Sequence, residues 1–168
     1  LKCIKSTRKL RGLLSDYKLT VFISLHLSSH GDGVGAFNYG WMYDLSPQIS
    51  RTSTYADIDR ILNRCSRQVE EQLGLSSFFR DTLRPSPLRP WQSYLPDHPA
   101  LGGEVSALAG ILGFSLVTTH DGRPLWGTPY DKPESVNWEY LEQQGRLISG
   151  LVLKLSQEPE LVSDRLPL

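Results

Sequence analysis

Histidine and aspartate side chains gather where an apolar segment at residues 21–27 runs into a glycine-rich turn. His26 lies near the end of the apolar segment, and His30 and Asp32 follow in the turn. Ligands and metals bind at the carboxyl ends of strands in open α/β sheets, and imidazole is a good zinc ligand. The pattern therefore predicts His26 as a candidate metal ligand, with His30 and Asp32 lining a cleft. The alternatives are a hydrogen-bonded strand-end histidine and ordinary turn chemistry.

A second group of candidate residues lies in the other half of the sequence. His120 follows a buried apolar segment, and it becomes a candidate metal ligand if its loop folds back toward the first group. The alternative is that Asp121-Gly122 is simply a turn. Glu104 begins a short helical segment, where the helix dipole favours a carboxylate, or it faces the cleft. Asp131 lies in the loop before the last helix and is also expected to line the cleft.

The elements that would position these residues follow from the spacing of apolar side chains. Helical spacing predicts helices at 4–17, 55–73, 104–112 and 138–156. Alternation predicts strands at 19–27, 34–39 and 114–119, with the second as the hairpin partner of the first. We expect a long loop at 80–102 and a frayed tail at 158–168.

Caps and buried faces can be assigned to the two longest predicted helices. Thr52 or Ser53 is expected to cap the helix at 55–73, and Gly74 is expected to end it. Ser135 or Asn137 is expected to cap the last helix. The residues expected to face inward are Ile58, Ile61, Leu62, Cys65, Val69 and Leu73 in the first, and Leu141, Leu147, Ile148, Leu151, Val152 and Leu155 in the second.

Strands interleaved with helices predict an α/β fold, a layered mixed sheet with flanking helices. Two or three strands make a thin sheet, so we expect further strands upstream and a domain that is incomplete at its N-terminus. A formal net charge of zero gives no support for nucleic-acid binding. No apolar run approaches the roughly 20 residues needed to span a bilayer. Cys3 and Cys65 are far apart and are expected to be reduced.

Three segments carry a resemblance to one protein family. They read ISLHLSS at 23–29, GGEV at 102–105 followed by AGILGFSL at 109–116, and GTPYDKPESVNWEYL at 127–141. Together they resemble the C-terminal half of the co-catalytic zinc aminopeptidases, the bacterial leucyl aminopeptidase and glutamate carboxypeptidase-like group of peptidase clan MH. The resemblance covers about residues 10 to 156 and implies a phosphorylase/hydrolase-type fold, with residues 1–157 as the C-terminal part of the domain and 158–168 as a tail.

The resemblance also implies a dizinc site, in which zinc activates a bridging water and polarises the scissile carbonyl. Two of the family's ligands should fall within this chain. His26 stands where the family has an aspartate, and Gly127 stands where it has the histidine before the threonine. The remaining ligands and the general-base glutamate would lie upstream of Leu1. One expected ligand is thus exchanged and one is lost.

Three hypotheses follow from these observations. The first is a zinc-aminopeptidase-like domain with a degenerate metal site, which binds a peptide or protein ligand or serves as a scaffold within a larger polypeptide. The second is an active zinc-dependent aminopeptidase or related hydrolase, with upstream ligands completed by His26 and His120. The third is an unrelated small α/β binding module. The sequence contains no G-x-S-x-G motif, P-loop or dinucleotide fingerprint that would indicate another enzyme class.

Overall fold

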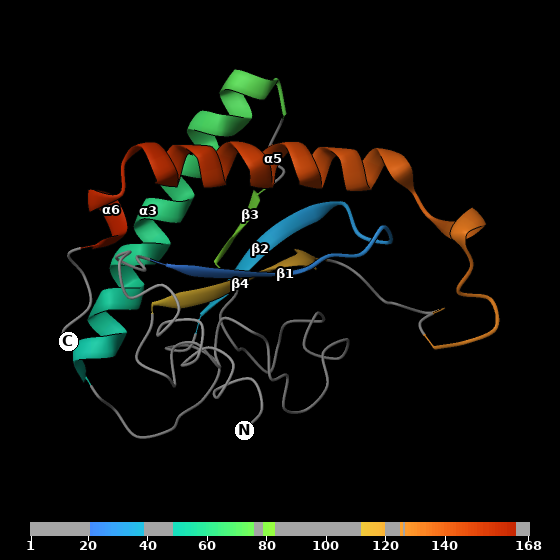
Figure 1. The fold of residues 1–168 in the computed structure, drawn as a ribbon, viewed down its shortest axis with the longest axis horizontal. Helices are drawn as coiled ribbons and strands as arrows, with labels where there is room; N and C mark the ends of the chain where they lie inside the picture. Colours follow the sequence, from blue (N-terminus) through green and yellow to red (C-terminus); the bar gives the residue numbers. More distant parts are fainter. Residues whose placement is uncertain are drawn as a thin grey trace, which may run out of the picture.

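Two long helices cover one face of a small mixed β-sheet (Figure 1). The computed structural model describes residues 21–38, 49–75, 79–82, 112–119, 125 and 127–163. Their elements are β1 (Phe22–His26), β2 (Gly33–Asn38), α3 (Ile49–Leu73), β3 (Phe79–Thr82), β4 (Gly113–Thr119), η2 (Pro133–Ser135), α5 (Trp138–Gln157) and α6 (Glu160–Ser163). The general α/β class expected from the sequence is confirmed. The predicted helix at 4–17, and all of the predicted helix at 104–112 except its last residue, lie outside the described residues.

The strand β4 occupies a central place in the sheet, whose order is β1-β4-β2-β3. It pairs in parallel with β1, from Phe22 opposite Gly113 to His26 opposite Val117. It pairs antiparallel with β2, which in turn pairs in parallel with β3. All seven residues of β4 are buried, as expected for an inner strand with neighbours on both sides.

The prediction that the first two strands form a hairpin is wrong. Strands β1 and β2 do not pair with each other, because β4 lies between them and pairs with both. The turn that joins them is too long for a two-residue hairpin loop, and its residues are hydrogen-bonded to β4 and α5. A strand far along the sequence has therefore taken the place that local pairing would have filled.

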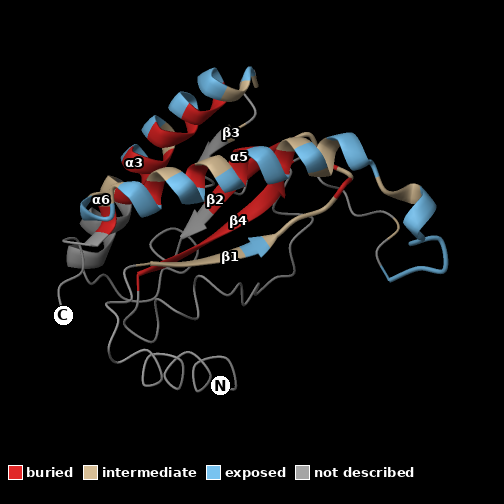
Figure 2. Ribbon diagram, turned by 45° about the horizontal axis from the view of Figure 1, so that its top comes forward, coloured by how far each residue is buried: buried red, intermediate tan, exposed pale blue. Residues whose placement is uncertain are grey.

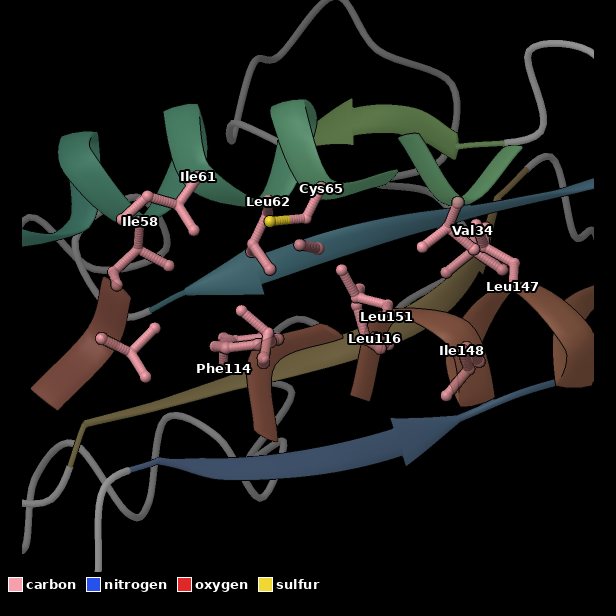
Figure 3. Packing of buried hydrophobic residues seen from close by; sticks show 14 of the residues in the cluster. Val34, Ile58, Ile61, Leu62, Cys65, Phe114, Leu116, Leu147, Ile148 and Leu151 are labelled. Atoms are coloured by element: carbon pink, nitrogen blue, oxygen red, sulfur yellow. The ribbon is translucent and has the colours of Figure 1, made fainter. Parts of the chain in front are cut away.

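The hydrophobic core lies between the sheet and the two helices (Figures 2 and 3). Figure 3 shows its centre, where side chains of β2 and β4 meet those of α3 and α5. The helices approach closely at Gly150, where an added Cβ would lie 2.5 Å from Val69 Cγ1. The buried residues of this core cluster are Val34, Ala36, Ile58, Ile61, Leu62, Cys65, Val69, Leu112, Phe114, Leu116, Leu147, Ile148, Leu151, Leu155 and Val162.

Helix α3 confirms its predicted inner face but not its start. It begins at Ile49, before the predicted residue 55, so Thr52 and Ser53 lie within the helix and do not cap it as expected, and Asp57 lies beyond the first turn. Asp57 instead pairs with Arg60 one turn later. The end is as predicted, because Gly74 adopts a φ of +66°. The amide of Leu75 then donates to the Glu70 carbonyl at 2.9 Å, which is the bond of a Schellman cap.

Helix α5 has a predicted N-cap residue, but its buried residues differ in part from those predicted. The side chain of Asn137 accepts a hydrogen bond from the Tyr140 amide at 3.1 Å, as an N-cap residue does. Val152 is 42% exposed, so its predicted inward position is wrong. It lies beside the inward stripe rather than on it, whereas Gln144 lies on the stripe and is fully buried.

Two segments expected to lack regular structure contain short elements. The first residues of the predicted loop at 80–102 belong to strand β3. Glu70 of α3 accepts the Phe79 amide hydrogen and so ties the start of β3 to the helix. The predicted frayed tail contains α6, where Val162 is 1% exposed against the core. In the part of the chain that the structure describes, no helix is long and apolar enough to cross a membrane.

Candidate functional site

The turn at residues 27–32, here called the strand-end turn, leads from the carboxyl end of β1 into β2. It contains the glycine-rich sequence that predicted a site, and it lies beside the carboxyl end of the parallel neighbour β4. The strand-end turn is held by side chains from β4 and α5 rather than by its own residues alone. These side chains are Thr118, which is 7% exposed, and Gln144, which is fully buried.

The hydroxyl of Thr118 bridges the turn and the helix. Thr118 Oγ1 accepts a hydrogen bond from the Ser28 amide at 2.8 Å. It lies 2.9 Å from Gln144 Oε1, to which it can donate, and 3.2 Å from the Ser28 carbonyl oxygen. A hydroxyl supplies one donor and two acceptor lone pairs, so this single side chain accepts from the Ser28 amide while it donates to Gln144 Oε1, the nearer of its two possible acceptors.

The side-chain amide of Gln144 completes the network. Gln144 Nε2 donates to the Ser28 carbonyl at 2.9 Å and to the Gly31 carbonyl at 3.2 Å. Both of its N–H groups and its carbonyl oxygen therefore have partners, which removes most of the cost of burying a polar side chain. The network spans β4, α5 and the strand-end turn, and it explains why a glutamine is buried in the apolar stripe of α5.

Close packing also restricts which residue can occupy position 31 in the strand-end turn. A Cβ added at Gly31 would lie 2.1 Å from the Thr119 carbonyl oxygen and 2.6 Å from Thr118 Cγ2. Glycine is therefore required here for close approach of the backbone. Nearby, Thr119 Oγ1 is buried and has no hydrogen-bond partner among the described residues.

His26 lies on a different face from the network. It is the last residue of β1, is half-buried, and stands opposite Val117 in the register. Alternation along the strand puts it on the face of Ser24, whose hydroxyl oxygen is 2.7 Å from that of Ser115. Ile23, on the other face, packs against the core beneath the helices. His26 thus points away from the helix layer that holds Gln144.

His30 and Asp32 are both half-buried in the strand-end turn. The His30 amide donates to Ser28 Oγ at 3.1 Å, a short-range bond typical of serine in turns. This favours turn chemistry for the backbone of the segment. The placement of both residues at the strand end agrees with the position expected for them.

Gly127 and Asp131 lie in the segment that leads into α5, which extends outward past the start of that helix (Figure 1). Both are exposed, and Gly127 has a φ of +71°. The segment is a series of turns in which Thr128 Oγ1 donates to the Leu125 carbonyl and the Asp131 amide donates to the Thr128 carbonyl. Asp131 is thus shown in an exposed turn.

The remaining predicted residues, His120 and Glu104, lie outside the described residues. Within the described ranges, no group of three or more histidine, cysteine, aspartate or glutamate side chains is placed to hold a metal ion. Catalytic zinc sites take three protein ligands. A zinc site that includes His26 would therefore need donors from beyond these ranges, such as His120.

Two ionisable groups next to the core have altered proton affinity. Burial raises the pKa of the Cys65 thiol, and the nearby Glu158 carboxylate raises it further against the opposing effect of Arg64. A hydrogen bond from Lys154 to Glu158 raises the pKa of the Lys154 ammonium group. Cys65 lies on α3 and Lys154 lies on α5. Neither is one of the candidate site residues, so neither pKa shift identifies a site.

The sequence interpretation missed Thr118 and Gln144, although one signal was present. Gln144 falls on the apolar stripe of α5, three residues after Leu141 and three before Leu147. A polar residue at a core position of a helix indicates a buried hydrogen-bond network. Its partners could not be named from this signal, because Ser28 lies 116 positions earlier in the chain.

Comparison with known proteins does not assign the chain to a family. No family model matches the sequence. No curated protein and no solved structure matches it either.

Proposed function

We propose that this chain belongs to an α/β domain of the zinc-aminopeptidase type whose metal site has degenerated, and that the domain binds a peptide or protein ligand without cleaving it. The single observation behind this proposal is the residue at position 127. The resemblance assigns a metal-binding histidine to this position, and the chain has glycine there. Glycine has no side chain with which to bind zinc.

The backbone conformation at position 127 supports the loss of the histidine, because this conformation favours glycine. Its φ of +71° lies in the left-handed region, where an L side chain is strained. A Cβ there would meet no atom of the described residues within 4 Å. The backbone at this position is thus suited to glycine for conformational reasons and not because a neighbour excludes a side chain. A histidine would have room here, but its backbone would be strained.

The strand-end turn supports the binding part of the proposal. Its backbone is held by Thr118 and Gln144, so little conformational freedom remains to be lost when a ligand binds. It also lies at the carboxyl ends of two parallel strands, where α/β proteins bind ligands. His30 and Asp32 provide half-buried polar side chains on this turn.

Zinc content separates this proposal from an active hydrolase. The purified full-length protein, dialysed against zinc and then against buffer, is expected to retain no stoichiometric zinc by plasma mass spectrometry and to leave leucine p-nitroanilide uncleaved. His26→Ala and the matched control Gly127→Ala are expected to give the same result. Stoichiometric zinc that is lost in His26→Ala but kept in Gly127→Ala, together with anilide cleavage, would instead establish the zinc hydrolase.

Ligand binding is tested by selecting peptides from a random display library on the same protein. Selected peptides are expected to bind at least about tenfold more weakly to His30→Ala, because that variant removes a polar contact on the strand-end turn. Gln157→Ala, at the opposite end of α5, is the control and should leave affinity unchanged. Failure to select any peptide, or equal binding by both variants, would contradict the proposal.

A further inference from the structure

The conformation of the strand-end turn depends on residues outside it. Hydrogen bonds from two side chains hold the backbone of the turn. One side chain is Thr118 of β4, and the other is Gln144 of α5. These donors and acceptors are buried, where a polar group without a partner is costly. The turn therefore keeps its shape only while both elements stay in place.

We infer that Gln144 and Thr118 are positioning residues that couple α5 to the strand-end turn, so that the orientation of His30 and Asp32 follows the position of the helix. The Gln144 amide spans two carbonyls of the turn, Ser28 and Gly31. A shift of α5 along its axis would break both bonds at once. The turn cannot restore these bonds by moving closer to β4, because Gly31 already lies against the Thr119 backbone.

The coupling works in both directions, as linkage requires. A ligand that displaces the turn would remove the partners of a fully buried glutamine and so destabilise the helix position seen here. A partner that displaces α5 would release the turn. The functional meaning of the coupling rests on the proposed ligand site, but the coupling itself is a property of the protein without ligand.

Amide hydrogen exchange measured by NMR on the full chain tests the coupling without any ligand. The informative amide is that of His30, which donates to Ser28 Oγ and makes no bond to Gln144 or Thr118. Faster exchange at His30 in a variant at either position therefore reports a change in the turn and not the loss of its own acceptor. The Leu151 amide, in the core part of α5, serves as the reference for global opening.

In Gln144→Leu and in Thr118→Val we expect exchange at His30 to rise about tenfold or more relative to Leu151. The double variant should show less than the sum of the two increases, because Gln144 and Thr118 bond to each other and hold the same residue, Ser28. Thr118→Ser keeps the hydroxyl and should restore slow exchange. Gln143→Leu, at the neighbouring position on α5, is the matched control and should leave His30 unchanged.

Three results would overturn the inference. Exchange at His30 could stay at the wild-type rate in both variants, the two effects could add in the double variant, or exchange could rise equally at His30 and Leu151. If Gln144→Leu fails to fold, Gln144→Asn replaces it, because the shorter side chain withdraws the amide from the turn while remaining polar. Since no zinc or peptide is involved, failure here is distinct from failure of the proposed function.

Discussion

At the scale of single residues, Gln144 is the most informative side chain of the molecule. Its neutral amide can both donate and accept, and all three of its polar contacts require this dual character. Two backbone carbonyls face its nitrogen, and a hydroxyl faces its oxygen. A carboxylate of nearly the same shape could accept from Thr118 but would repel both carbonyls. The identity of this residue is therefore set by hydrogen-bond polarity rather than by volume.

The variant Gln144→Glu tests this with pH. Burial and two carbonyl neighbours will raise the pKa of the introduced carboxyl in the folded state above its unfolded value of about 4.3. Below that value the neutral acid can still donate one of the two hydrogen bonds, and the variant should be only modestly less stable than the wild type. As the pH rises above about 4.3, the variant should lose up to about 1.4 kcal/mol per pH unit relative to wild type until the folded-state pKa is passed.

The measurement is urea unfolding of both proteins between pH 4.5 and 8. Gln143→Glu is the control, because Gln143 is only half-buried and bonds to the exposed Glu139. It should differ from wild type by a small amount with little dependence on pH. A stability difference between Gln144→Glu and wild type that is constant over this range would contradict the assigned polarity.

At the scale of elements, the α3–α5 contact decides how the helix layer covers the sheet. The two helices bring Gly150 and Val69 together, and the absence of a Cβ at Gly150 permits the approach. The same helix contains a second glycine, Gly145, which is exposed and has nothing near its missing Cβ. Arg146, four residues before Gly150, adds a contact between the two helices, in which its guanidinium donates to the carbonyl of Leu73, the last residue of α3.

The two glycines predict opposite effects of the same substitution. Gly145→Ala should stabilise the protein by about 0.5–1 kcal/mol, because alanine loses less backbone freedom in a helix. Gly150→Ala should destabilise it by about 1 kcal/mol or more, because the new methyl group meets Val69, whose β-branched side chain has few other rotamers in a helix. Chemical denaturation measures both.

A double variant separates the clash from a general effect on the helix. Val69→Ala removes the group that the new methyl would meet, so Gly150→Ala should cost little or become favourable in that background. A cost of Gly150→Ala that is the same with and without Val69→Ala would mean that the helices do not cross as described.

At the scale of the whole molecule, the helix layer of α3 and α5 closes the described core on one face of the sheet. Cys65 sits within this core and is 1% exposed, and burial raises the pKa of its thiol. Because the thiolate is the reactive form, Cys65 is protected both by its inaccessibility and by its protonation. Its reactivity therefore reports separation of α3 from the rest of the core.

Alkylation of Cys65 by iodoacetamide at pH 8 should be slower in the folded chain than in urea by at least about a thousandfold. Peptide mass spectrometry distinguishes this label from that at Cys3. Gly150→Ala should accelerate labelling and Gly145→Ala should slow it. Because the folded-state pKa is raised, thiol ionisation leaves stability unchanged below the unfolded pKa of about 8.5 and lowers stability above it. Rapid labelling of the native chain would contradict the position of Cys65.

The sequence predicted what depends on neighbours along the chain. The start of α5 at Trp138, the end of α3 at Gly74 and the buried face of α3 follow from capping residues and from apolar side chains three or four positions apart. Strand β4 followed from a short run of apolar residues. For the candidate site, the strand-end position of His26, His30 and Asp32 also followed from local pattern.

Only the tertiary structure decided which strands are neighbours and what holds the strand-end turn. Strand β4 lies between two strands that come far earlier in the chain, and the bond between Ser28 and Thr118 joins residues 90 positions apart. The choice among strand partners depends on the free energy of the assembled sheet and helices, which no short window of residues contains. The sequence alone thus established a glycine-rich turn with histidine and aspartate at a strand end. The fold made it a turn held by a helix, with His26 on the opposite face from the glutamine that holds it.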